Sequence, residues 1–180
     1  AIVFYGAINR MALPENCPSH LQIATSDPGS MFLSISQDGD GRAPLGQATL
    51  IASVFTDTAF WSNLDEFAYK KQKQAVLIKI VEELQNFLCF DSCHWLHQEL
   101  ATPISFAKWT GRPNGIVGGL GQHPSIFGPF GISSRTPFRG LWVCGDSIHP
   151  GEGTAGVSQS ALMVCRQLLA ERGNQLNVES

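Results

Sequence analysis

The first 60 residues alternate between short apolar runs and turn signals. The apolar runs lie at residues 2–8, 21–25, 31–36 and 48–55. They are separated by Pro14, Asp27-Pro28-Gly29 and Asp38-Gly39-Asp40-Gly41. Runs of this length bounded by Gly, Pro and Asp are typical of strands joined by short turns. The pattern therefore predicts four strands in a largely antiparallel sheet.

From Asn63 onward the apolar positions follow a helical period instead. They are Tyr69, Val76, Leu77, Ile80, Leu84, Phe87 and Leu88, and lysines and glutamates fill the other positions. This predicts an amphipathic helix of about 23–25 residues that covers the sheet. We expect Asn63 to cap it, Asp65 and Glu66 to lie in its first turn, and Trp61 to pack on it from outside.

Two shorter elements follow this helix. Residues 91–100 are expected to form a half-buried strand, with His94 and His97 on opposite faces. Thr102 can then cap a short helix that has Pro103 at its first position and ends at Gly111. After it, the glycine-rich residues 115–122 match neither a dinucleotide fingerprint nor a phosphate loop, and they predict a loop that another group approaches closely.

Two patterns suggest metal ligands but lack the necessary spacing. Zinc is suggested by Cys89, Cys93, His94 and His97, yet no second short-spaced pair accompanies them. The Asp38-Gly39-Asp40-Gly41 run would need a glutamate at the twelfth position of a calcium loop, where Thr49 stands. We expect a plain turn there and no metal site.

Composition and charge narrow the function classes. Charged residues make up 15% of the chain and the net charge is -3, with no basic cluster, which excludes a nucleic-acid groove. Apolar runs are too short to span a bilayer, since even residues 75–81 are interrupted by Lys79. The five irregularly spaced cysteines are expected to be buried, reduced thiols. The expected location is cytoplasmic, or peripheral to a membrane.

The most informative stretch is residues 140–172. An apolar run ends at Gly145-Asp146, three further glycines follow, and an apolar helical period continues to Glu171. A strand, a glycine turn and a helix N-terminus in succession form a binding device for an electron-rich group. We expect free N–H groups at residues 154–157 and a role for Asp146 as an acceptor for sugar-type hydroxyls. His149 would hydrogen-bond the turn backbone or take part in proton transfer.

At these residues the sequence resembles a known family. The run GLWVCGDSIHPGEGTAGVSQSALMVCRQ resembles the C-terminal FAD signature of the carotenoid desaturase and isomerase group, which is related to phytoene desaturases and more distantly to flavin amine oxidases. TPISFAKWTGRPNGIVGGLGQ and FGPFGISSRTPFRGLW are similar to cyanobacterial-type carotenoid 3′,4′-desaturases. The likeness covers residues 100–172 well and residues 1–99 loosely.

The resemblance implies an α+β fold and a set of FAD contacts. Residues 1–135 would be part of a substrate-binding domain with a mainly antiparallel sheet and covering helices. Residues 136–173 would be the C-terminal strand, turn and helix of an incomplete Rossmann-like FAD-binding domain, and residues 174–180 a frayed tail. Gly145 and Asp146 would lie by the FAD pyrophosphate and ribityl chain. The flavin N1/C2=O edge would face Gly153, Thr154, Ala155, Gly156 and Val157.

The function implied is desaturation of a carotenoid or similar apolar polyene by hydride transfer to FAD. Two alternatives remain: a redox-neutral carotenoid cis-trans isomerase that uses reduced flavin, and a non-catalytic remnant or binding module. Candidate residues for an apolar substrate channel are Phe55, Trp61, Phe127 and Phe130.

The family's opening G-x-G-x-x-G turn does not occur in this chain. The resemblance therefore implies a C-terminal fragment of a longer flavoenzyme, which begins directly in a strand. Such a fragment is expected to bind FAD poorly by itself, and to be inactive. It is also expected to self-associate through the apolar surface that the missing N-terminal half would cover.

Overall fold

The computed structural model describes residues 1–120, 125–126 and 131–173 of the 180-residue chain. The chain divides into two compact units, Ala1–Ile116 and Val117–Ser180, and each is described by itself. The expected division at residue 135 separates a substrate portion from a cofactor portion. It is a division by function, and it stays a prediction.

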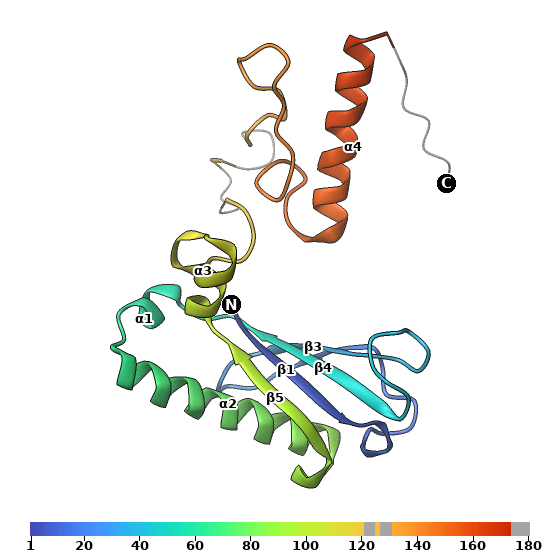
Figure 1. Cartoon of the computed structure of the whole chain (residues 1–180), viewed down its shortest axis with the longest axis vertical. Helices are drawn as coiled ribbons and strands as arrows, with labels where there is room; N and C mark the ends of the chain where they lie inside the picture. The colour runs from blue at the N-terminus through green and yellow to red at the C-terminus, as the bar shows by residue number, and fades with distance from the viewer. Residues whose placement is uncertain (121–124, 127–130, 174–180) are drawn as a thin grey trace. The chain divides into compact units, whose positions relative to one another are not determined.

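The first unit is built on one antiparallel sheet. Its strands are β1 (Ile2–Asn9), β2 (His20–Ile23), β3 (Met31–Ile35), β4 (Gln47–Val54) and β5 (Trp95–Ala101). They lie in the order β2-β3-β4-β1-β5, and every described pairing is antiparallel. Together with the helices, this sheet confirms the α+β fold (Figure 1).

One face of the sheet forms the core of this unit. Side chains alternate along β1, so that Phe4 and Ile8 are fully buried while Tyr5 between them is exposed. The long helix α2 (Glu66–Leu88) contributes residues at a four-residue spacing, namely Val76, Ile80, Leu84 and Leu88. Burying each of these side chains stabilises the fold by about 1.5–3 kcal/mol. The helix runs along the sheet in Figure 1.

The opposite face of the sheet, the second face, also carries apolar side chains. Tyr5, Phe32 and Ile51 are 38%, 46% and 37% exposed. Tyr5 pairs with Ile51 across β1 and β4, and Phe32 pairs with Ser53 across β3 and β4. A sheet face that only meets water is usually polar, so this face has the composition of a surface that another group covers.

The expected start of α2 was wrong by two residues. Asp65 caps the helix, because its carboxylate accepts a hydrogen bond from the Ala68 N–H at 2.7 Å. Asn63 instead ends a separate short helix, α1 (Thr58–Ser62), which sequence analysis missed. Asp57 caps α1 by accepting from the Ala59 N–H at 2.9 Å. Two aspartate caps eight residues apart therefore begin two helices where the sequence pattern predicts one.

Two expectations about the segment after α2 have different outcomes. His94 lies in a 3-10 turn (η2, Ser92–His94) ahead of β5, so the two histidines do not share a strand. Residues Ser92–His94 form this turn, so the pairing with β1 begins only at Trp95. The short helix α3 (Pro103–Thr110) is confirmed, with Thr102 and Ser105 forming a reciprocal capping box. The chain then passes through another 3-10 turn (η3, Pro113–Gly115), and an earlier one (η1, Arg10–Ala12) follows β1.

The cysteines are not buried as expected. Cys17 is half-buried, and Cys89, Cys93, Cys144 and Cys165 are exposed. The core of the first unit is filled by Ile, Leu, Val, Met, Ala and aromatic side chains, and Cys17 packs against it from its edge.

Two kinds of feature are not found in the part of the chain that the structure describes. None of its helices is both long enough and apolar enough to cross a membrane. No three His, Cys, Asp or Glu side chains gather there in a way that could hold a metal ion.

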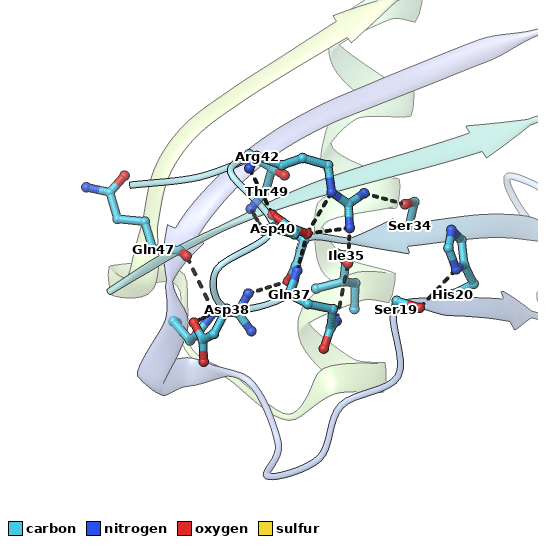
Figure 2. A network of polar contacts seen from close by, with 12 residues as sticks. Ser19, His20, Ser34, Ile35, Gln37, Asp38, Asp40, Arg42, Gln47 and Thr49 are labelled. Atoms are coloured by element: carbon cyan, nitrogen blue, oxygen red, sulfur yellow. Dashed lines mark hydrogen bonds and ion pairs between the residues drawn. The ribbon is translucent and has the colours of Figure 1, made fainter. Parts of the chain in front are cut away.

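The loop between β3 and β4 is organised by Asp40 (Figure 2). Its carboxylate accepts hydrogen bonds from the backbone N–H groups of Gln37 at 2.6 Å and Arg42 at 2.8 Å, and from the Arg42 guanidinium at 2.7 Å. The Gln37 and Arg42 N–H groups lower the pKa of Asp40 from 3.8 to about 2. The carboxylate therefore holds a turn together from within.

This loop predicts a specific loss of stability in acid. Because the folded-state pKa of Asp40 is depressed, its stabilising contribution is complete above about pH 4 and disappears as the pH falls toward 2. We expect NMR titration of the Asp40 carboxyl carbon to give a midpoint near 2. Unfolding measured between pH 5 and 2 should be less pH-dependent in Asp40→Asn than in the wild type. A midpoint near 4, or equal pH dependence, would show that these hydrogen bonds do not form.

Candidate functional site

The helix expected after the glycine turn is present as α4 (Gly153–Glu171). In a helix that begins at Gly153, the N–H groups of Gly153, Thr154 and Ala155 precede the first intrahelical hydrogen bond. Glu152 occupies the N-cap position but makes no side-chain capping bond. Thr154 and Ala155 are exposed, whereas Gly156 and Val157 are half-buried in the first turn. The positive end of α4 is thus left without a side-chain cap.

The strand expected before the turn does not form. Within the described residues, the segment around 140–144 makes one isolated bridge, between Arg135 and Trp142. In this bridge the Val143 N–H donates to the Ser134 carbonyl at 2.9 Å, and nearby the Leu141 N–H donates to the Phe138 carbonyl at 3.2 Å. A strand needs a neighbouring ladder over several residues, and one bridge does not provide it. Gly145 and Asp146 therefore lie in a turn after an extended segment.

A buried serine fixes this turn to α4. Ser160 is fully buried, and its hydroxyl oxygen accepts a hydrogen bond from the Gly145 N–H at 2.9 Å. The turn closes on itself where the Ile148 N–H donates to the Gly145 carbonyl at 3.2 Å. Sequence analysis missed Ser160. The available signal was a small polar residue among the apolar positions of the helix, about one turn after Gly156.

The turn leaves open space beside two of its glycines. Gly145 and Gly153 have φ angles of +128° and +82°, and a Cβ atom at either position would meet nothing within 4 Å. A side chain there would be strained by the backbone conformation and would project into this space. Asp146, which follows Gly145, is half-buried and accepts a hydrogen bond from the Ser147 hydroxyl at 3.4 Å.

Of the glycine-rich residues 115–122, Gly118 and Gly119 pack on this turn, and residues 121 and 122 lie outside the described residues. A Cβ atom at Gly119 would overlap the Asp146 backbone, and one at Gly118 would overlap the Glu152 carboxylate. Beside them, the Leu120 N–H donates to the Ser147 hydroxyl at 3.2 Å. The expected close approach to this loop is confirmed at these positions, and the group that approaches is the turn itself.

The four channel candidates are not brought together. Trp61 is 1% exposed and lies in the core, where its indole N–H donates to Thr56 at 2.9 Å. Phe55 is 95% exposed and lines a hollow of about 130 Å³ with Phe32 and Ser53 at the second face of the sheet. Phe127 and Phe130 lie outside the described residues. Sequence analysis did not identify the second face of the sheet as an apolar surface, although the alternation of side chains along the strands indicates it.

Comparisons with known proteins add an independent line of evidence. No protein-family model matches the chain. The chain is 31% identical over 153 residues to the chloroplastic prolycopene isomerase of Daucus carota, and 30% identical over 152 residues to that of Arabidopsis thaliana. It is 30% identical over 154 residues to the chloroplastic prolycopene isomerase 2 of an Oncidium hybrid cultivar.

These matches cover 81% of this chain but 24%, 25% and 25% of the three relatives. The chain thus spans about a quarter of the length of the curated relatives that it matches. Within that span the likeness extends well beyond the glycine turn, because it includes most of the chain. The expected family resemblance is confirmed: this chain is similar in sequence to carotenoid isomerases of the carotenoid desaturase and isomerase group.

Proposed function

We propose that this chain forms part of an FAD-dependent enzyme that modifies a carotenoid polyene. The observation that carries the proposal is the uncapped N-terminus of α4 beside a glycine turn with open space at Gly145 and Gly153. The likeness to prolycopene isomerases supports a carotenoid as the substrate class. The resemblance of residues 140–167 to an FAD signature supports the cofactor.

The local chemistry fits a flavin. The N–H groups of Gly153, Thr154 and Ala155, together with the helix dipole, would stabilise negative charge on the N1/C2=O edge. The half-buried Asp146 carboxylate would accept hydrogen bonds from ribityl or ribose hydroxyls. Bound flavin supplies electron transfer to or from the conjugated substrate, and the protein residues bind and orient it.

Between the two reactions expected, the names of the relatives favour redox-neutral cis-trans isomerisation. Desaturation by hydride transfer is the second candidate, and it is supported by the similarity of residues 102–122 and 127–142 to carotenoid desaturases. The N-terminus of α4 would serve both reactions, because both place negative charge on the flavin at some stage.

The second face of the sheet is a suitable wall for an apolar substrate. Tyr5, Phe32 and Ile51 offer apolar surface there, and Phe55 adds an aromatic side chain at the end of β4. These residues replace Trp61 as our candidates, since a core side chain would meet substrate only after unfolding. A hydrocarbon needs such surface and no polar partner.

We propose that another part of an FAD-binding fold packs on the second unit. Among its described residues, Ile148 is the single buried large apolar side chain. Several others are 41–71% exposed, namely Val117, Leu120, Ile126, Ile132, Phe138, Leu141 and Val143. Such surface is typical of one that another part of a protein covers.

The reaction is tested with the complete natural polypeptide that contains this chain. Prolycopene in detergent or liposomes is incubated without oxygen, with either oxidised or chemically reduced FAD, and products are separated by chromatography. We expect double-bond isomerisation with reduced FAD and no change in the number of double bonds. Added double bonds with oxidised FAD would establish desaturation instead. No product under either condition would leave the non-catalytic binding module as the function.

Asp146→Ala in the same polypeptide is expected to weaken FAD binding about 10- to 150-fold. It removes a charge-assisted interaction of roughly 1.5–3 kcal/mol. The dissociation constant is measured by flavin fluorescence, and the melting temperature is compared without cofactor. Glu171→Gln, at the far end of α4 and 3.5 Å from Arg135, is the matched control. Unchanged affinity would remove Asp146 from the site, and a large fall in the apo-protein's melting temperature would make its role structural.

A further inference from the structure

A hollow of about 590 Å³ lies within the first unit, whereas the glycine turn belongs to the second unit. It is lined by side chains from β1, α2, β5 and α3, among them Tyr5, Tyr69, Lys73, Glu99, Lys108 and Trp109. Its volume falls in the range of small-molecule sites. The proposed flavin chemistry does not use these residues, except that Tyr5 also belongs to the second face of the sheet.

The walls of this hollow are fixed by local contacts. The Tyr69 hydroxyl lies 3.1 Å from the Thr102 hydroxyl, which joins α2 to the start of α3. Thr102 is fully buried and caps α3 in the reciprocal capping box. Both helices therefore have a defined position on the rim, so that Lys73 and Lys108 are presented from supported elements.

The charge of the hollow favours an anion. Lys73 and Lys108 make no ion pair within the described residues, whereas Lys70 pairs with Glu66 at 2.6 Å. Glu99 is the lining carboxylate, and its ion-pair contact is with His97 at 3.7 Å. Two ammonium groups against one carboxylate leave the lining net positive in a chain of net charge -3. An incoming carboxylate or phosphate would supply the missing counter-charge.

The same hollow has apolar surface at its edge. Trp109 is 82% exposed and Ile104 is 39% exposed, both on α3. The Lys108 ammonium lies 5.7 Å from the centre of the Trp109 ring, which keeps a cation beside an aromatic face. A hydrocarbon chain that covers the Trp109 ring would remove a large apolar area from water, which favours binding. Cationic and apolar surfaces thus adjoin within one hollow.

We propose that this hollow binds an amphiphile with an anionic head group, a carboxylate or a phosphate monoester. The head group pairs with Lys73 and Lys108, and the hydrocarbon chain lies over Trp109 and Ile104. Such a ligand is distinct from the carotenoid, which is a hydrocarbon without a charged group. The site is therefore a second ligand site on the chain, and its occupancy does not depend on bound flavin.

The test measures binding of four probes to the complete natural polypeptide that contains this chain, by calorimetry and tryptophan emission. The probes are decyl phosphate and decanoate below their critical micelle concentrations, decanol below its solubility limit, and inorganic phosphate. We expect the first two to bind at one site and to shift the emission to shorter wavelength, through Trp109. The shift should be absent in Trp109→Phe. Equal affinity for inorganic phosphate would show a simple anion site, and equal affinity for decanol an apolar surface only; either result overturns the proposal.

Lysine variants provide the second measurement. The double variant Lys73→Gln/Lys108→Gln should bind decyl phosphate about 2- to 30-fold more weakly, because it removes two exposed charge pairs. Lys71→Gln is the control, because Lys71 is an exposed lysine on the same helix that does not line the hollow. Circular dichroism verifies folding. Equal affinities of the double variant and the control would contradict the proposal.

Discussion

Burial of one face of the sheet under α2 is the constraint on which the first unit depends. Alternation along each strand sends every second side chain into this core, so Phe4, Ile8 and Leu50 are fully buried. The intervening side chains must point to the second face, because a shift of register by one residue would exchange the two faces. The apolar composition of the second face is therefore not a requirement of the core. It is the feature of this unit that the proposed contact with an apolar substrate would account for.

The second unit relies on polar contacts instead. Ser160 holds the Gly145 turn onto α4, and Ser134 accepts a hydrogen bond from the Gln167 amide at 3.0 Å near the other end of that helix. Both serines are buried, so each bond lies where water competes little for its groups. These contacts tie the extended segment and the turn to α4, and they set the turn beside the uncapped end of the helix. The position of the candidate site is thus determined by a few hydrogen bonds and by close backbone packing at Gly119.

Much of this architecture was predictable because its signals are local. The strands and α3 follow from alternation, turn residues and the capping pattern around Thr102 and Pro103. The expectations that were wrong needed information from distant residues. Asn63 and Asp65 are both acceptable caps, and the choice depends on how α1 places Trp61 in the core. The missing strand before Gly145 depends on which segment lies beside it, which an apolar run does not reveal. The role of Ser160 also depends on a distant residue, because its hydrogen-bond partner Gly145 is fifteen residues away.

The central claim is that the N-terminus of α4 and the glycine turn hold the flavin, and hydrogen exchange tests it most directly. Exchange is measured by mass spectrometry on the complete natural polypeptide with and without FAD. The account predicts slower exchange on FAD binding in peptides that contain Gly145 and residues 153–155, and unchanged exchange in the loop around Asp40. Binding of FAD with no change at residues 145–157 would contradict the claim, because a flavin held there must cover those N–H groups.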